Sequence, residues 1–178
     1  MKVSTAKLLI LNLINKLDRQ FFPATDGNVS IRTKEGLVIT PKGWNKLKLR
    51  FNDLIYTQFD NINPNTSSEV LMHIQIYKKR ENINVILHTH HPSFLKLAYK
   101  HRPIEPVIDE LKLFLGKIPV SEYAPPGSME LAINVEKALK NFKGVIMKKH
   151  GAVFVARNTK EILYTIKRAL TGAEIYEG

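Results

Sequence analysis

The apolar positions near the N-terminus repeat at the period of an α-helix. Leu9, Leu13 and Leu17 lie four residues apart, which predicts a helix over residues 3–17 that buries one stripe of side chains. The cluster Thr25-Asp26-Gly27-Asn28 follows and has the composition of a turn. The chain therefore opens with a helix and a turn.

Short β-branched runs in the rest of the chain predict strands. Residues 29–32 and 37–40 flank the turn Lys34-Glu35-Gly36, which predicts a hairpin. Residues 84–90 are apolar at first and polar at the end, as in a buried strand that ends at Pro92. Further extended segments are expected at 117–120, 144–147 and 152–155.

Polar residues at helix starts mark four more helices. Ser67 or Ser68 is expected to cap a helix whose first turn holds Glu69. The other predicted helices cover 93–100, 129–139 with Ser128 as cap, and a closing segment to Ile175 with Thr159 as cap. These elements predict a mixed α/β domain with several strands in one sheet and helices packed over it.

Composition narrows the class of protein. The chain has 178 residues, 44% of them hydrophobic, which suits one domain over residues 1–178. It contains no cysteine, and this excludes disulfide scaffolds, thiolate zinc fingers, iron–sulfur centres and a cysteine nucleophile. No apolar run is long enough for a membrane span or a signal peptide. We therefore expect a cytoplasmic protein with no membrane partner.

Histidines at the ends of two predicted strands suggest a metal site. His88 and His90 are two residues apart and should share one face of their strand. His150 follows another apolar run, and Glu69 heads the helix before the first histidine strand. Three imidazoles and a carboxylate suit a divalent metal, with Zn²⁺ favoured and Fe²⁺, Co²⁺ or Mn²⁺ as alternatives. On spacing alone, core histidines that donate to backbone carbonyls explain the pattern equally well.

The other histidines carry weaker arguments. His91 should point to the face opposite His90, and His101 lies in a polar stretch. His73 follows Glu69 by one helical turn, where it would make a metal pair, but we favour burial beside its own helix.

Three small polar turns suggest a second kind of site. Gly27-Asn28, Thr40-Pro41-Lys42-Gly43 and Ser67-Ser68 each offer backbone N–H groups or hydroxyls, and Lys42 adds a positive charge. Each turn alone is explained by capping or chain reversal. If they gather beside Glu69, a phosphorylated substrate would lie next to the metal.

Six motifs taken together resemble the class II aldolase/adducin family, over about residues 8–176. They are, in order, Gly27-Asn28-Val29-Ser30-Ile31-Arg32, Ile39-Thr40-Pro41-x-Gly43, Ser67-Ser68-Glu69-x-x-x-His73, His88-Thr89-His90, Tyr123-Ala124-Pro125-Pro126-Gly127 and Lys149-His150-Gly151. The resemblance implies a three-layer α/β/α sandwich around a mostly antiparallel sheet, and a homotetramer with active sites between subunits. It also implies zinc on His88, His90 and His150.

The resemblance further assigns roles and a reaction. Glu69 would be a fourth metal ligand in the resting site and the acid/base once substrate displaces it. Phosphate-binding positions of the family are matched by Gly27, Asn28, Lys42, Gly43, Ser67 and Ser68. The reaction implied is cleavage of a fuculose-1-phosphate-like ketose phosphate to dihydroxyacetone phosphate and an aldehyde, through an enediolate that the metal stabilises.

The family contains other activities, which leaves alternatives. Two residues favour an aldolase. The ribulose-5-phosphate 4-epimerases of the family carry Asp in place of Glu69, and the methylthioribulose-1-phosphate dehydratases carry Ala in place of Ser68. Phe22-Pro23-Ala24-Thr25 and the position of Glu110 instead resemble the dehydratases. The fuculose aldolases have a tyrosine near residues 106–111 and another in a C-terminal tail, and we expect this chain to lack both.

The net charge of +11 suggests a competing class, a basic nucleic-acid-binding domain. Basic residues cluster around Lys46, Lys78 and Lys148, but the clusters are short and lack interleaved aromatic residues. We therefore expect a solvated basic surface and no specific nucleic acid.

Overall fold

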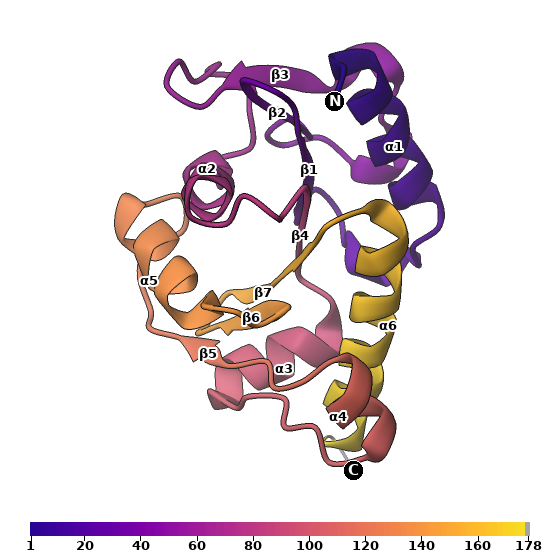
Figure 1. Ribbon diagram of the computed structural model, residues 1–178, viewed down its shortest axis with the longest axis vertical. Helices are drawn as coiled ribbons and strands as arrows, with labels where there is room; N and C mark the ends of the chain where they lie inside the picture. The colour runs from indigo at the N-terminus through magenta and orange to yellow at the C-terminus, as the bar shows by residue number, and fades with distance from the viewer. Residues whose placement is uncertain (177–178) are drawn as a thin grey trace.

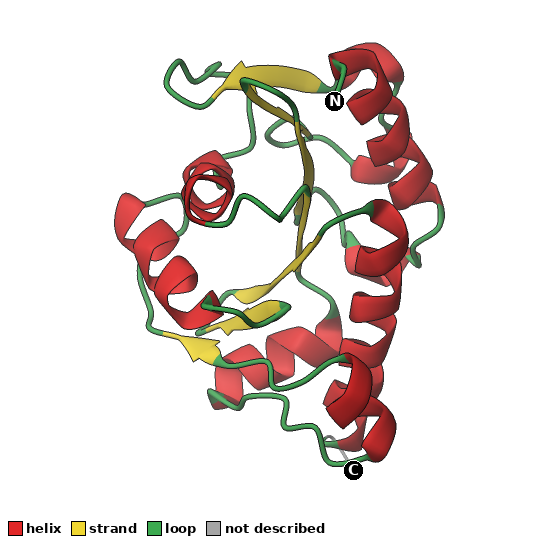
Figure 2. Cartoon of the chain, viewed as in Figure 1, coloured by secondary structure: helices red, strands yellow, loops and turns green. Residues whose placement is uncertain are grey.

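The extended runs of the sequence pair into a single seven-stranded sheet in the computed structural model, which describes residues 1–176 (Figure 1, Figure 2). The strands are β1 (Asn28–Arg32), β2 (Gly36–Ile39), β3 (Ile55–Gln58), β4 (Val85–Thr89), β5 (Val120–Ser121), β6 (Gly144–Met147) and β7 (Gly151–Ala156). Their order across the sheet is β3-β2-β1-β4-β7-β6-β5. Every neighbouring pair is antiparallel except β5 and β6, which are parallel.

Helices cover both faces of this sheet. They are α1 (Val3–Asn15), α2 (Val70–Lys79), α3 (Pro92–Lys100), α4 (Asp109–Phe114), α5 (Met129–Leu139) and α6 (Thr159–Ile175). Short 3-10 turns are η1 (Arg19–Phe21), η2 (Lys46–Lys48) and η3 (Phe51–Asp53). Figure 1 shows α2 and α5 on one side of the sheet and α1, α3, α4 and α6 on the other.

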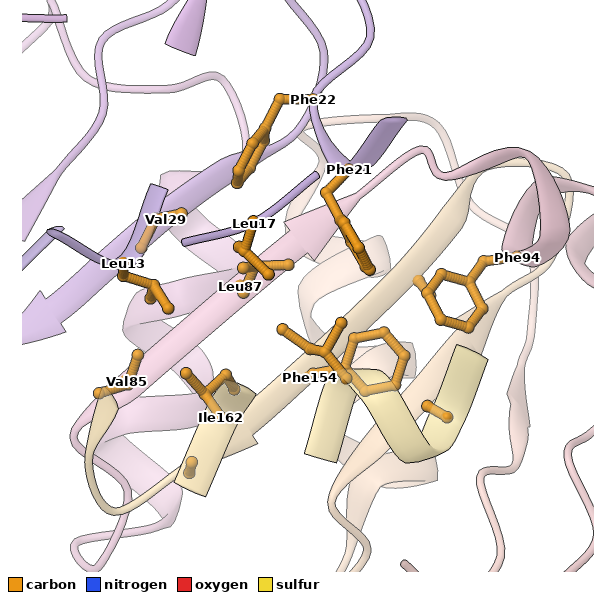
Figure 3. Packing of buried hydrophobic residues seen from close by; sticks show 14 of the residues in the cluster. Leu13, Leu17, Phe21, Phe22, Val29, Val85, Leu87, Phe94, Phe154 and Ile162 are labelled. Carbon is orange, nitrogen blue, oxygen red and sulfur yellow. The ribbon is translucent and has the colours of Figure 1, made fainter. Parts of the chain in front are cut away.

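Alternation along the central strands builds two separate cores. Val85 and Leu87 of β4 pack with Phe154 of β7 against α1, α3 and α6 (Figure 3). Ile86 points the other way and packs with Val153 into the core beneath α2 and α5. Since both faces of the sheet are buried by helices, the expected three-layer α/β/α sandwich with a mostly antiparallel sheet is confirmed.

Several predicted elements differ in detail. The first helix ends at Asn15, although Leu17 is still buried in the core. Glu69 is the N-cap residue of α2, so neither Ser67 nor Ser68 caps it. Asn158, whose side chain accepts the N–H of Glu161, caps α6 in place of Thr159.

The boundaries of other elements shift as well. The segment expected at 117–120 contributes only the two-residue strand β5, and α3 begins at Pro92 with His91 as its N-cap. The strand β3 and the helix α4 were not predicted. Within residues 1–176, no helix is both long enough and apolar enough to cross a bilayer.

Candidate active site

His88 in β4 and His90 directly after this strand lie on the sheet face that carries α2 and α5. His88 is two residues after Ile86, which belongs to the core under α2 and α5, and His90 follows two residues later. Thr89 between them faces the opposite side, where its hydroxyl donates to the carbonyl oxygen of Phe21 at 2.6 Å. The strand period therefore brings His88 and His90 together, as predicted, with ring centroids 4.8 Å apart.

His150 reaches the same point from the hairpin between β6 and β7. Lys149 turns this three-residue loop with a left-handed φ of 59°, and its N–H donates to the carbonyl of Ala98. The ring centroid of His150 lies 4.9 Å from that of His88 and 5.1 Å from that of His90. One nitrogen from each of the three imidazoles lies within 4.8 Å of the others.

Glu69 adds a buried carboxyl group to the three imidazoles. As the N-cap residue of α2 it is 5% exposed, and its Oε1 lies 3.8 Å from Nε2 of His150. Burial raises the pKa of this carboxyl to about 7, although it accepts the backbone N–H of Gly127. Its other oxygen, Oε2, is buried without a hydrogen-bond partner.

The three imidazoles are held as neutral rings. Nδ1–H of His88 donates to the carbonyl of Ala152 at 3.0 Å, which leaves the lone pair on Nε2. That nitrogen faces Nε2 of His90 at 3.0 Å. Burial lowers the pKa of all three rings, for His150 to about 4.

A divalent metal ion fits this arrangement. Neutral imidazoles offer lone pairs, and metal binding needs them unprotonated. A cation would also satisfy Oε2 of Glu69, which is buried beside the imidazoles without a hydrogen-bond partner. The residues that would hold it are His88, His90 and His150, with Glu69 beside them.

The three polar turns predicted from the sequence converge on the same place. All ten predicted site residues line one pocket of about 340 Å³: Gly27, Asn28, Lys42, Gly43, Ser67, Ser68, Glu69, His88, His90 and His150. The hydroxyl of Thr40 accepts the N–H of Val29, and Pro41 pairs with Thr66. One side-chain hydrogen bond and one isolated β-bridge thus connect the three turns.

Gly27 and Asn28 fit closely against the histidine strand. A Cβ on Gly27 would lie 2.7 Å from the carbonyl oxygen of His88, and the residue has a left-handed φ of 71°. Asn28 pairs with His88 in the β1–β4 ladder, and its buried Oδ1 has no partner. A larger residue at position 27 would push the turn away from the imidazoles.

Sequence reasoning missed several residues of the pocket. Asp26, Lys46, Pro126 and Lys149 also line it. Oδ2 of Asp26 lies 3.5 Å from Nδ1 of His90, so this carboxylate orients the ring. Asp26 and Lys149 adjoin predicted site residues, which was an available signal; nothing in the sequence marks Lys46 as different from its surface neighbours.

The remaining histidines lie outside the cluster. His73 is fully buried, and its Nδ1 shares a 2.7 Å hydrogen bond with the hydroxyl of Ser30. His91 packs on Phe21 at 4.8 Å between ring centroids, on the face opposite His90. His101 is exposed at the end of α3. These three outcomes match the preferred interpretation of each residue.

Glu110, the residue that resembles a dehydratase acid, lies away from the pocket in this chain. It is exposed on α4, where its carboxylate contacts the guanidinium of Arg168 at 3.3 Å.

Comparison with known proteins gives one consistent family. A model of the class II aldolase and adducin N-terminal domain matches residues 11–176. An L-fuculose phosphate aldolase of Methanococcus maripaludis is 32% identical over 146 residues, which cover 81% of this chain and 80% of the relative. A 5-methylthioribulose-1-phosphate/5-deoxyribulose-1-phosphate aldolase of Escherichia coli is 31% identical over 158 residues, covering 85% and 73%.

The fold comparison agrees with the sequence comparison. The solved structure of an L-fuculose 1-phosphate aldolase superposes with a TM-score of 0.90 at 26% identity. The superposition covers 99% of this chain and 86% of the other.

Proposed function

Because this chain belongs to the class II aldolase and adducin family and is one of its metal-dependent lyases, we propose that it cleaves a fuculose-1-phosphate-like ketose phosphate into dihydroxyacetone phosphate and an aldehyde. The observation that carries the proposal is the single pocket. It unites His88, His90, His150 and Glu69 with the three polar turns. A metal site alone would also suit a binding protein, whereas a metal site beside a phosphate site suits a sugar-phosphate enzyme.

The polar turns supply orientation. Backbone N–H groups of Gly27 and Gly43, the side chains of Asn28 and Lys42, and the hydroxyls of Ser67 and Ser68 would hold the substrate phosphate. The phosphate anchors one end of the ketose, so the carbonyl and hydroxyl oxygens of the ketose would extend toward the imidazoles. Such anchoring contributes to the rate by removing rotational freedom before reaction.

Glu69 is the group placed to move a proton. Burial alone raises the pKa of its carboxyl group to about 7, and a neighbouring cation would lower it again, so a carboxyl group here can both give and accept a proton near neutral pH. During cleavage it would accept, in its ionised form, the proton of the hydroxyl that becomes the aldehyde oxygen, and then deliver that proton to the substrate carbon that loses its bond to the aldehyde fragment. The metal ion, for which we favour zinc with Fe²⁺, Co²⁺ or Mn²⁺ as alternatives, would supply Lewis-acid stabilisation of the negative charge that develops on oxygen.

The choice among family activities rests on named residues. A dehydratase needs its acid near the substrate, and within one chain Glu110 contacts Arg168 outside this pocket. A 5-deoxyribulose-1-phosphate-like substrate is the second candidate, because the Escherichia coli relative carries that name at 31% identity. Tetrameric assembly with shared active sites, and a cytoplasmic location, stay predictions from the sequence.

The direct test is a panel of ketose 1-phosphates with the zinc-loaded chain. We expect the zinc-loaded chain to release dihydroxyacetone phosphate from L-fuculose 1-phosphate or 5-deoxyribulose 1-phosphate. After its metal is removed by a chelator, the same chain should release none. Consumption of a substrate without release of dihydroxyacetone phosphate would show a dehydratase or an epimerase and refute the proposal.

A further inference from the structure

Lys46 is a buried lysine in the pocket with no role in the proposed reaction. It lies in η2 and is only 3% exposed. Its Nζ donates to the carbonyl oxygen of Thr25 and, at 3.0 Å, to that of Trp44. Lysine is almost never buried without partners, because an ammonium group loses its hydration there.

The ammonium group of Lys46 is charged at neutral pH in spite of its burial. Burial lowers its pKa to about 8, and the nearby carboxylate of Asp26 opposes this shift. A charged donor makes stronger hydrogen bonds to carbonyl oxygens than a neutral one. The two bonds therefore act as firm links between Lys46 and the segments that hold Thr25 and Trp44.

The two carbonyl groups belong to different turns. We call residues 25–28 the first turn and residues 40–44 the second turn; both line the pocket. At their strand ends, the N–H of Thr40 donates to the carbonyl of Val29 at 3.1 Å. At their far ends, Thr25 and Trp44 are joined through Nζ of Lys46.

Both turns need such a link because each bends at glycine. Gly27 and Gly43 have the same left-handed φ of 71°. Glycine reaches this conformation without strain, but it also has the most backbone freedom to lose. A turn held at one end only would sample other conformations, and its N–H groups would no longer converge on one anion.

We propose that Lys46 is a positioning residue that holds the first and second turns at the spacing needed to bind the substrate phosphate. This inference rests on the proposed function, since it takes the two turns as the phosphate site. Lys46 acts through the backbone of the turns, and its loss should weaken phosphate binding while leaving the proton transfer by Glu69 intact.

A purely structural role predicts a different result. Replacing a buried charge by an apolar side chain of similar length often leaves a protein equally or more stable. If Lys46 served stability alone, Lys46→Met would lower the melting temperature and leave phosphate affinity unaltered. If it positions the turns, affinity falls while the melting temperature is kept or raised.

The experiment compares Lys46→Met with Lys48→Met in the metal-loaded chain. Lys48 lies in the same 3-10 turn and is exposed, so its replacement removes the same charge without touching either turn. Binding of inorganic phosphate is measured by calorimetry, and KM and kcat are measured with a ketose phosphate that the chain cleaves. We expect Lys46→Met to raise the phosphate dissociation constant and KM at least about tenfold with kcat nearly unchanged, and Lys48→Met to change neither.

A chemical rescue gives a second arm. The chain has no cysteine, so Lys46→Cys introduces a unique thiol, which bromoethylamine converts in the unfolded chain to a lysine analogue before refolding. We expect the cysteine variant to bind phosphate weakly and the aminoethylated protein to recover most of the affinity. A folded Lys46→Met or Lys46→Cys protein that binds phosphate as tightly as the unchanged chain overturns the proposal. If the unchanged chain binds no phosphate, the phosphate role of the turns fails with it, whereas the metal site is unaffected.

Discussion

At the scale of single residues, Glu69 has the least ordinary surroundings. One of its carboxyl oxygens faces His150 and the other has no hydrogen-bond partner, although the side chain is almost fully buried. A buried carboxyl group with an unpaired oxygen does not add to the free energy of unfolding. Its position makes sense as part of a reaction site, where burial brings the pKa near neutrality.

Glu69→Gln should separate metal binding from turnover. The amide keeps the volume of the side chain and leaves His88, His90 and His150 in place, so we expect bound metal to be retained. It cannot deliver the proton, so turnover should fall about 100-fold or more. Metal content and release of dihydroxyacetone phosphate are measured on the same sample. Glu130→Gln, at an exposed position on α5, is the matched control, and near-normal turnover of Glu69→Gln would remove Glu69 from its proposed role.

At the scale of elements, the strand that carries His88 could be predicted from the sequence, whereas the elements around it could be predicted only in part. The period of two along 84–90 determines that His88 and His90 share a face, whatever the rest of the fold. That His150 comes to the same face depends on the pairing of β4 with β7, a long-range contact that no local pattern contains. Its place in the site was expected only through the family resemblance.

The elements that were missed are the short ones. The edge strand β3 has four residues, of which only Thr57 is buried, so its alternation is weak. The helix α4 has six residues and one buried side chain, Leu111. Lys46 was assigned to a basic surface cluster, because no local pattern shows that its side chain reaches the carbonyl oxygen of Thr25, 21 residues earlier, as well as that of Trp44. Short elements and buried charges are specified by packing more than by local sequence.

The β6–β7 hairpin leads to a prediction about Gly151. A Cβ at this position would lie 2.6 Å from the carbonyl oxygen of Thr89 and 2.9 Å from Cδ2 of His90. We therefore expect Gly151→Ala to displace the His90 ring and weaken zinc affinity about tenfold or more, as measured by competition with a chromophoric chelator.

The control is Gly144→Ala at the opposite end of the hairpin. There a Cβ would lie 2.5 Å from the ring of Phe154 and 2.8 Å from the carbonyl of Val153. This variant should lower stability and leave zinc affinity unaltered. Equal zinc affinities in the two variants would contradict the argument that the absence of a Cβ at position 151 keeps the His90 ring in place.

At the scale of the whole molecule, the net charge is +11, and one lysine of each basic cluster that the sequence suggested is buried or paired with a carboxylate. Lys46 is buried, Lys78 pairs with Asp60 at 2.5 Å, and Lys148 lies 3.6 Å from Glu122. A net positive charge raises association with any anion, phosphorylated sugars included.

Metal binding should stabilise the whole chain, because its proposed ligands come from separate parts of the fold: β4, the β6–β7 hairpin and the start of α2. Zinc at a free concentration of 100 times its dissociation constant should add about 2.7 kcal/mol to the free energy of unfolding. This corresponds to a rise in melting temperature of about 5–10 °C for a chain of this size. Calorimetry of the chelated protein before and after zinc addition measures it.

His90→Ala tests the same prediction from the other side. This variant should bind no zinc, show no rise in melting temperature and release no dihydroxyacetone phosphate. His101→Ala removes an exposed histidine at the end of α3 and should show the same turnover and the same zinc-dependent rise in melting temperature as the unchanged chain. A His90→Ala protein that cleaves substrate without metal would refute the proposed chemistry.

The strand β4 is apolar on both of its faces, since Val85 and Leu87 enter one core and Ile86 the other. Hydrophobic burial alone would therefore accept this strand displaced by one residue along its neighbours. Such a displacement turns His88 and His90 toward α1 and α6 and leaves Thr89 and His91 facing the pocket. Insertion of one residue before His88 should thus turn the histidines away from the pocket within an intact sandwich, and insertion of two should restore their face but move them about 7 Å along the strand, away from His150. The register of β4 against β1 and β7, more than its hydrophobicity, determines whether this sheet carries a site.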